Sequence, residues 1–258
     1  MSLPPPPPPI ALTHSLKSTR SSLFLTCEEF FWLNSGHLTA GDSYAGIDRA
    51  AGLYVEPGRY YENAATKRRI KNLIEVCGLM KCLVTSVEGK KCTMEELLLN
   101  HTARYIDSIR AMSAGLGGDA GDCAFFGTGS YDIAALAVGS CIEACKAVMA
   151  KTENGRPKTV ENAYVLCRPP GHHACEDEGM GFCIFNNVAI AAKYARLHLG
   201  AERIAIVDYD VHHGNGTQQA FYGRRDVLFI SLHEESLYPI GSGNVDERGE
   251  GEGFGFNM

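Results

Sequence analysis

Short apolar runs alternate along the chain with longer stretches of helical periodicity. The apolar runs predict buried strands at Leu23–Thr26, Cys82–Val84, Ala163–Cys167, Ile204–Val207 and Val227–Leu232. The periodic stretches predict helices at Lys67–Val76, Glu95–Met112, Ile133–Met149, Asn187–Leu199 and Gly216–Phe221. This alternation indicates an α/β fold, a doubly wound, mostly parallel sheet with helices on both faces. Ligands of such sheets bind at the carboxyl ends of the strands.

The N-terminal segment differs in composition from the rest. Pro4–Pro9 is an unbroken proline run, which favours an extended polyproline II segment. We expect residues 1–22 to form a disordered tail and residues 23–258 to form one partial domain. The tail resembles a mitochondrial transit peptide only weakly, and it lacks the charged-then-apolar order of a secretory signal.

Charge and cysteine usage exclude several classes of protein. The net charge is −6, which argues against an electrostatic nucleic-acid binder. No apolar run approaches the roughly 20 residues of a membrane span. The ten cysteines are scattered and form no CxxC pair, a pattern typical of reduced thiols in an intracellular protein. We therefore expect an intracellular protein of the nucleus or cytoplasm, with no direct contact to nucleic acid or membrane.

A dense group of polar side chains follows the apolar run Ile204–Val207. Asp208, Asp210 and His212 alternate along the chain, so they start on one side of the strand where it ends. A carboxylate and an imidazole two positions apart suit a divalent metal, and Zn²⁺ accepts nitrogen and oxygen ligands. A polar loop accounts for one such side chain but poorly for the whole group. The segment therefore predicts a metal site.

A second polar group follows the run Ala163–Cys167. Here Pro-Pro-Gly leads into His172 and His173, and tandem imidazoles at a strand end suit general acid–base chemistry near neutral pH. Further along, Phe182 stands in a glycine-flanked loop before a helix. Its aromatic ring could form a pocket wall or pack in the core.

Three sequence blocks resemble the signature motifs of the zinc-dependent histone deacetylase superfamily. They are Arg-Pro-Pro-Gly-His-His-Ala at 168–174, Gly-Phe-Cys-Ile-Phe-Asn-Asn at 181–187, and the segment 208–217. The similarity runs from about Phe30 to the last residue, and the class II branch and the bacterial histone deacetylase-like amidohydrolases are most similar. The resemblance implies the arginase/deacetylase fold and zinc-dependent hydrolysis of the amide of acetyl-lysine in a histone or another protein.

The resemblance also implies roles for individual side chains. Asp210 and His212 match two zinc ligands. His173 matches the general base that takes a proton from the attacking water, and His172 matches its electrostatic partner. Asp208 matches the carboxylate that orients His172.

Further residues match the surroundings of that centre. Asn215 matches the group behind His173, Gly181, Phe182 and Tyr238 match the acyl-lysine tunnel, and Asp119 matches the rim carboxylate that holds the substrate backbone. The family's structural potassium site is matched mainly by the backbone of Asp208, Asp210, His212, Ser231 and Leu232. The implied partners are an acetylated protein or small acylated amine as substrate, and co-repressor-type proteins.

The resemblance is incomplete at the C-terminal side. The family's domain continues past the segment matched by 251–257, and the continuation carries a third zinc ligand, an Asp, and a Tyr that donates to the oxyanion. Neither Asp-Pro nor Gly-Gly-Tyr occurs in this sequence. We therefore expect an incomplete catalytic domain that is poorly stable and weakly active or inactive. The alternative is an inactive deacetylase-like fragment that acts as a protein-binding partner.

Other hydrolase chemistries fit the sequence less well. An arginase-type manganese pair needs a further Asp where this chain has Gly214. No G-x-S-x-G elbow is present for a serine hydrolase. Cys175 and Cys183 lie close to His173 in the sequence, so a thiol nucleophile stays a formal alternative.

Overall fold

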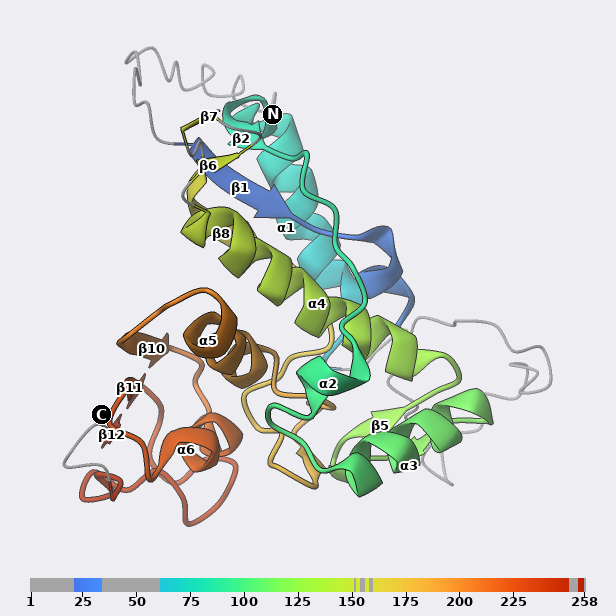
Figure 1. The fold of residues 1–258 in the computed structure, drawn as a ribbon. Coiled ribbons are helices and arrows are strands. Elements are labelled where there is room, and N and C mark those ends of the chain that lie inside the picture. The colour runs from blue at the N-terminus through green and yellow to red at the C-terminus, as the bar shows by residue number, and fades with distance from the viewer. Residues whose placement is uncertain are drawn as a thin grey trace, which may run out of the picture.

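The computed structural model describes residues 21–33, 61–150, 152–153, 156–157, 160–250 and 255–257. Within them, parallel strands and the helices packed beside them form the predicted α/β fold (Figure 1). The expected tail at residues 1–20 lies outside the described residues. Ser21 and Ser22 already belong to β1 (Ser21–Leu25), so the first strand starts before Leu23.

One parallel sheet has the order β2–β1–β8, with β2 at Leu83–Val84 and β8 at Val160–Val165. The central strand β1 contributes the buried side chains of Leu23, Phe24 and Leu25. Helix α4 (Ser130–Met149) packs against β8 and β1 and covers this sheet. The near-continuous apolar run of β1 is therefore explained by its position between two strands.

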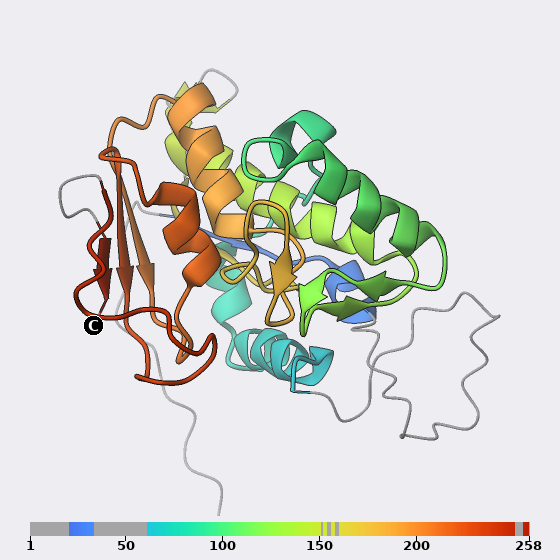
Figure 2. The same ribbon diagram turned by 90° about the horizontal axis from the view of Figure 1, so that it is seen from below.

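A second parallel sheet has the order β10–β11–β12, with β10 at Ile204–Asp208, β11 at Val227–Ser231 and β12 at Gly255–Asn257. Figure 2 shows its three strands running side by side. Side chains of β11 alternate between buried and half-buried positions, the period of a strand with two different faces. The buried face packs on α5 (Asn187–His198) and α6 (Asn215–Phe221).

The predicted single sheet is thus divided within the described residues. The strands β8 and β10 each pair on one side only, although α5 connects them along the chain. Helix α5 packs against α4 and α6, so one helical layer contacts both sheets (Figure 2). The loops after β8 and β10 nevertheless meet, because His172 and Asp208 are hydrogen-bonded.

The helix predicted at Glu95–Met112 is wrong in one respect, since the structure divides it. Helix α2 spans Met94–Leu97 and α3 spans Ala103–Ala114. Between them, buried His101 accepts a hydrogen bond from the Asn186 amide at Nε2 (3.0 Å), and its Nδ1 lies 3.2 Å from the Glu176 carbonyl. The next backbone amide, that of Thr102, donates to the Glu176 carbonyl at 3.0 Å instead of to a helical partner. The apolar spacing continues through the break.

The remaining elements border these two sheets. They are α1 (Ala64–Val76), the short 3-10 helices η1 (Glu28–Trp32) and η3 (Leu79–Cys82), and two-residue strands β3 (Gly118–Asp119), β4 (Gly121–Asp122), β5 (Phe125–Phe126), β6 (Thr152–Glu153), β7 (Arg156–Pro157) and β9 (Gly179–Met180). All ten cysteines are free thiols, as their scattered spacing predicted. In the described part of the chain, no helix has the length and apolar character needed to cross a membrane.

Gly139 provides a direct test of the packing around α4. A Cβ atom there would overlap the Lys90 carbonyl and lie 2.7 Å from the Cys92 nitrogen, both of which are backbone atoms. Gly139→Ala should lower the free energy of unfolding by about 2 kcal/mol in urea titrations, because neither backbone group can move cheaply. Gly223→Ala is the matched control, since its Cβ would meet no atom within 4 Å. An unchanged or raised unfolding free energy in Gly139→Ala would contradict this packing.

Candidate active site

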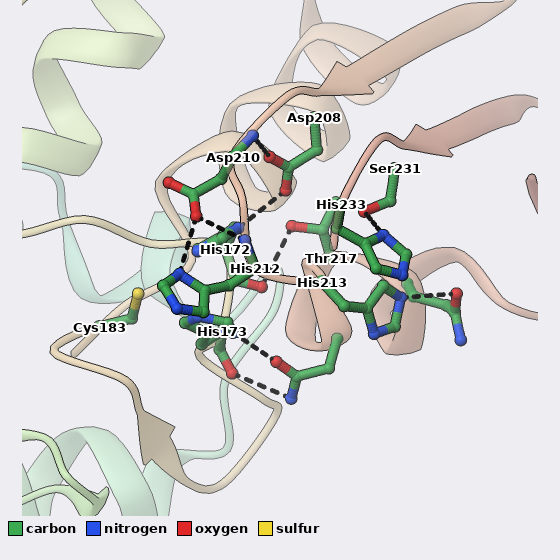
Figure 3. A network of polar contacts seen from close by, with 12 residues as sticks. His172, His173, Cys183, Asp208, Asp210, His212, His213, Thr217, Ser231 and His233 are labelled. Carbon is green, nitrogen blue, oxygen red and sulfur yellow. Dashed lines mark hydrogen bonds and ion pairs between the residues drawn. The ribbon is translucent and has the colours of Figure 1, made fainter. Parts of the chain in front are cut away.

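The tandem histidines lie where the loop after β8 meets the end of β10 (Figure 3). The two rings stand 4.0 Å apart between centroids. His172 Nδ1 is 2.8 Å from Asp208 Oδ2, and both side chains are mostly buried. Burial acts to raise the pKa of Asp208, but the hydrogen bond and charge of His172 outweigh it and hold that pKa below its ordinary value. The Asp208 carboxylate therefore stays ionised and fixes the His172 ring.

His173 is buried and is oriented by an amide rather than a carboxylate. Its Nδ1 lies 2.7 Å from Asn215 Oδ1, while Asn215 Nδ2 contacts the sulfur atoms of Met180 and Cys175. The amide oxygen therefore faces the ring, so Nδ1 donates and Nε2 keeps its lone pair. Burial, reinforced by His172, lowers the pKa of His173 to about 4. At neutral pH this imidazole is uncharged and can accept a proton.

Asp210 and His212 form a separate pair of potential metal ligands on the segment after β10. Asp210 Oδ1 lies 3.1 Å from His212 Nδ1, and both side chains are about half exposed. Two ligand atoms at zinc bond lengths in a tetrahedral site are separated by about 3.3 Å, so this pair fits one edge of such a site. No third His, Cys, Asp or Glu joins them in metal-binding geometry among the residues that the structure describes.

Aromatic and glycine residues lie around His173. The Tyr238 ring stands edge-on to His173 with centroids 5.1 Å apart, and its hydroxyl donates to the Asp122 carbonyl at 3.3 Å. Gly181 has φ +48°, and a Cβ there would overlap His173 and crowd Tyr238. Phe182 is half-buried with φ +69°, so it neither lies in the core nor stands fully in solvent.

The remaining predicted site residues, Asp119, Ser231 and Leu232, lie on neighbouring segments. Asp119 is exposed, and its carboxylate accepts from the Gly121 amide at 3.1 Å. Its neighbour β4 pairs with β9, which places this segment beside the loop of Gly181. Ser231 is paired with Asp208 across the sheet, and the Leu232 amide donates to the Asp208 carbonyl at 2.8 Å. Of the residues expected around potassium, Asp208, Ser231 and Leu232 therefore have neighbouring backbone groups.

Several groups in the site received no role from the sequence. The Asp122 carbonyl accepts from the Tyr238 hydroxyl, and the Met180 thioether lies beside Asn215. His213 and His233 both lie in segments that resemble the deacetylase family, 208–217 and Ser-Leu-His at 231–233, but the resemblance assigned neither side chain a role. Ser242 lies in the glycine-rich segment Gly241–Gly255, whose composition fits either a surface loop or the rim of an active site. Their grouping depends on tertiary contacts that spacing does not reveal.

The neighbouring thiols are poor nucleophiles. Burial raises the pKa of Cys175 to about 11, and burial also raises the pKa of Cys183. A thiol reacts as its thiolate, so both groups are in the unreactive form near neutral pH. The geometry therefore weighs against the thiol alternative.

The parallel α/β architecture, with polar loops at the strand ends, is that of the arginase/deacetylase class of folds. The family model of the histone deacetylase domain matches residues 60–258, and the chain belongs to this family. Deacetylase relatives support hydrolytic chemistry for the family.

Individual relatives agree with this assignment. The chain is 43% identical over 210 residues to a histone deacetylase-like amidohydrolase of Pseudomonas aeruginosa, covering 80% of this chain and 53% of the relative. It is 42% identical over 187 residues to histone deacetylase HDA1 of Saccharomyces cerevisiae, covering 68% of this chain and 26% of that protein. The crystal structure of the HDA15 HD domain superposes with a TM-score of 0.78 at 31% identity, covering 93% of this chain and 62% of that one.

These comparisons also show a difference in length. The chain spans about half the length of the bacterial and archaeal relatives it matches.

Proposed function

We propose that this chain forms part of a zinc-dependent deacetylase that hydrolyses the amide of acetyl-lysine. The observation that carries the proposal is the neutral, Asn215-oriented His173 beside the Asp210–His212 donor pair. A metal ligand pair and a general base at the same strand ends are the two components that metal-assisted amide hydrolysis requires.

Each side chain has a defined task in this proposal. Asp210 and His212 would hold Zn²⁺, which would polarise the acetyl carbonyl and lower the pKa of a bound water. His173 Nε2 accepts the proton of the attacking water, and Asn215 keeps that nitrogen facing the reaction. His172, held by ionised Asp208, helps to keep the pKa of His173 low, so protonated His173 readily passes its proton to the leaving amine.

Rim residues account for the binding of a narrow substrate. Tyr238, Phe182 and Gly181 form walls against which an acyl-lysine side chain would exclude water. Asp119 presents an exposed carboxylate to the substrate backbone. Potassium would be held by the backbone around Asp208 and Leu232 as a structural ion. We propose an acetylated protein or a small acylated amine as substrate, co-repressor-type proteins as partners, and a location in the nucleus or cytoplasm.

The remaining parts of the site are proposed to come from polypeptide outside the described residues. Catalytic zinc sites have three protein ligands, and the described chain supplies two. The open edges of β8 and β10 offer places for further parallel strands, and exposed Tyr164 and Val207 lie on these two strands. Strands added in parallel there would bring their own carboxyl ends to Asp210 and His212.

The experiment measures bound zinc and hydrolysis of an acetyl-lysine peptide. The chain is assayed alone and with the C-terminal part of the Pseudomonas aeruginosa relative that lies beyond the match, added as a separate polypeptide. We expect less than one equivalent of zinc and little turnover alone. With the complement, bound zinc should approach one equivalent and turnover should rise at least about 10²-fold. This factor is the change in kcat that one hydrogen-bond donor to the oxyanion usually contributes.

Asp210→Ala is the matched control for this experiment and should prevent both gains. Zinc uptake that is the same in Asp210→Ala would contradict the proposed ligands. Complex formation without zinc or turnover would favour the alternative of an inactive, protein-binding fragment.

A further inference from the structure

Two histidines behind the Asp210–His212 pair have no task in the chemistry described above. His213 follows β10 and His233 follows β11, and Figure 3 shows their rings side by side. The ring centroids are 4.8 Å apart. His213 is only 2% exposed, so its polar atoms need protein partners.

His213 connects α6 to the loop after Tyr238. Gln218 Nε2 donates to Glu247 at 2.6 Å, so its Oε1 faces His213 Nε2 at 3.0 Å and accepts that proton. His213 Nδ1 is then the accepting nitrogen, and the Ser242 hydroxyl lies 2.9 Å from it. The same hydroxyl lies 3.0 Å from the Pro239 carbonyl, so its single proton is donated either to that carbonyl or to His213 Nδ1.

His233 contacts the next residue of the same loop. Its Nε2 donates to the Gly243 carbonyl at 3.0 Å, and its Nδ1 lies 2.8 Å from the Ser231 hydroxyl. Gly243 is buried with φ +81°, and an added Cβ would come within 2.7 Å of His213 Cγ and 2.9 Å of His233 Cε1. The loop backbone therefore rests directly on both imidazoles.

The loop residues that contact the two imidazoles, Ser242 and Gly243, are joined to Tyr238 by a short turn. The Ser242 amide donates to the Pro239 carbonyl at 3.3 Å, which closes the turn immediately after Tyr238. At its other side Tyr238 packs edge-on against His173. We propose that His213 and His233 are positioning residues that seat the 239–243 turn and thereby hold Tyr238 against His173. The seating itself is independent of the proposed function, whereas its effect on an acyl-lysine tunnel rests on that function.

The test uses the full chain and needs no catalytic activity. Hydrogen exchange of the 236–247 segment and nitration of Tyr238 by tetranitromethane, both mapped by mass spectrometry, are compared in His233→Ala, His233→Gln and Ser242→Ala. A glutamine amide can place its nitrogen near the His233 Nε2 position and donate to Gly243. Ser236→Ala is the matched control, because it removes an exposed hydroxyl from the same loop.

We expect exchange of this segment and nitration of Tyr238 to rise about tenfold in His233→Ala and Ser242→Ala. His233→Gln and Ser236→Ala should stay within about twofold of the unmodified chain. Exchange elsewhere, followed in β10 and β11, should not change, which separates loop release from unfolding. Equal exchange and nitration in Ser242→Ala and Ser236→Ala, or no rescue by His233→Gln, would overturn the proposal. Neither result depends on whether the chain hydrolyses acetyl-lysine.

Discussion

His173→Ala should lower turnover of an acetyl-lysine peptide by about 10³-fold in the zinc-loaded, complemented preparation, with bound zinc unchanged. The expectation follows from the position of this ring. Its Nδ1 is held by Asn215, its pKa is lowered to about 4, and it lies 6.0 Å between centroids from His212 without being one of the two ligands. Its loss therefore removes the proton acceptor and leaves the metal ligands in place.

The measurement compares kcat/KM and zinc content in parallel. His198→Ala is the matched control, since it removes an exposed histidine from α5 and should leave both quantities unchanged. Turnover of His173→Ala within tenfold of the unmodified protein would assign the base to another group. A loss of zinc together with turnover would instead place His173 among the ligands.

The elements of this fold follow from sequence where local pattern and tertiary packing agree. The run Leu23–Thr26 and the run Val227–Leu232 both predict strands, and β1 and β11 lie there with shifts of one or two residues at their ends. The polar groups after two strands predicted a shared site, because parallel strands direct their carboxyl ends to one edge. The 2.8 Å contact between His172 and Asp208 is the expected meeting of the two groups.

The features that escaped prediction depend on partners distant in the chain. At the break between α2 and α3 the Thr102 amide donates to the distant Glu176 carbonyl and His101 accepts from the Asn186 amide, and apolar periodicity does not record such contacts. Within the described residues the two main sheets are separate because β8 and β10 do not pair with each other, and a strand's own residues do not encode its neighbours. The contact of the 239–243 turn with His213 and His233 depends on the close approach of the Gly243 backbone. The glycine-rich composition of this segment does not reveal that contact.

Arg168 is the side chain whose replacement should cost the most stability. It is fully buried at the start of the loop that carries the tandem histidines. Its Nε and Nη2 atoms lie 2.9 Å and 2.7 Å from the two Glu62 oxygens, and its Nη1 donates to the Phe30 carbonyl at 3.2 Å. Arg168→Met would leave the Glu62 carboxylate buried, with Lys67 at 2.8 Å as its remaining ion-pair partner among the described residues. We expect a loss of about 3–5 kcal/mol in the free energy of unfolding.

The matched control is Arg104→Met, which breaks the exposed pair with Asp177 and should cost less than about 1 kcal/mol. The double variant Arg168→Met/Glu62→Leu should lose less unfolding free energy than the sum of its single variants, because no buried charge stays unpaired.

Burial acts to raise the pKa of Glu62, but Arg168 outweighs it and the pKa is lowered. The pair should therefore stabilise the fold fully above the ordinary carboxyl pKa of 4.5 and progressively less as the pH falls through the lowered value. Urea titrations at both ends of this window test the assignment, and equal losses in Arg168→Met and Arg104→Met at neutral pH would refute it.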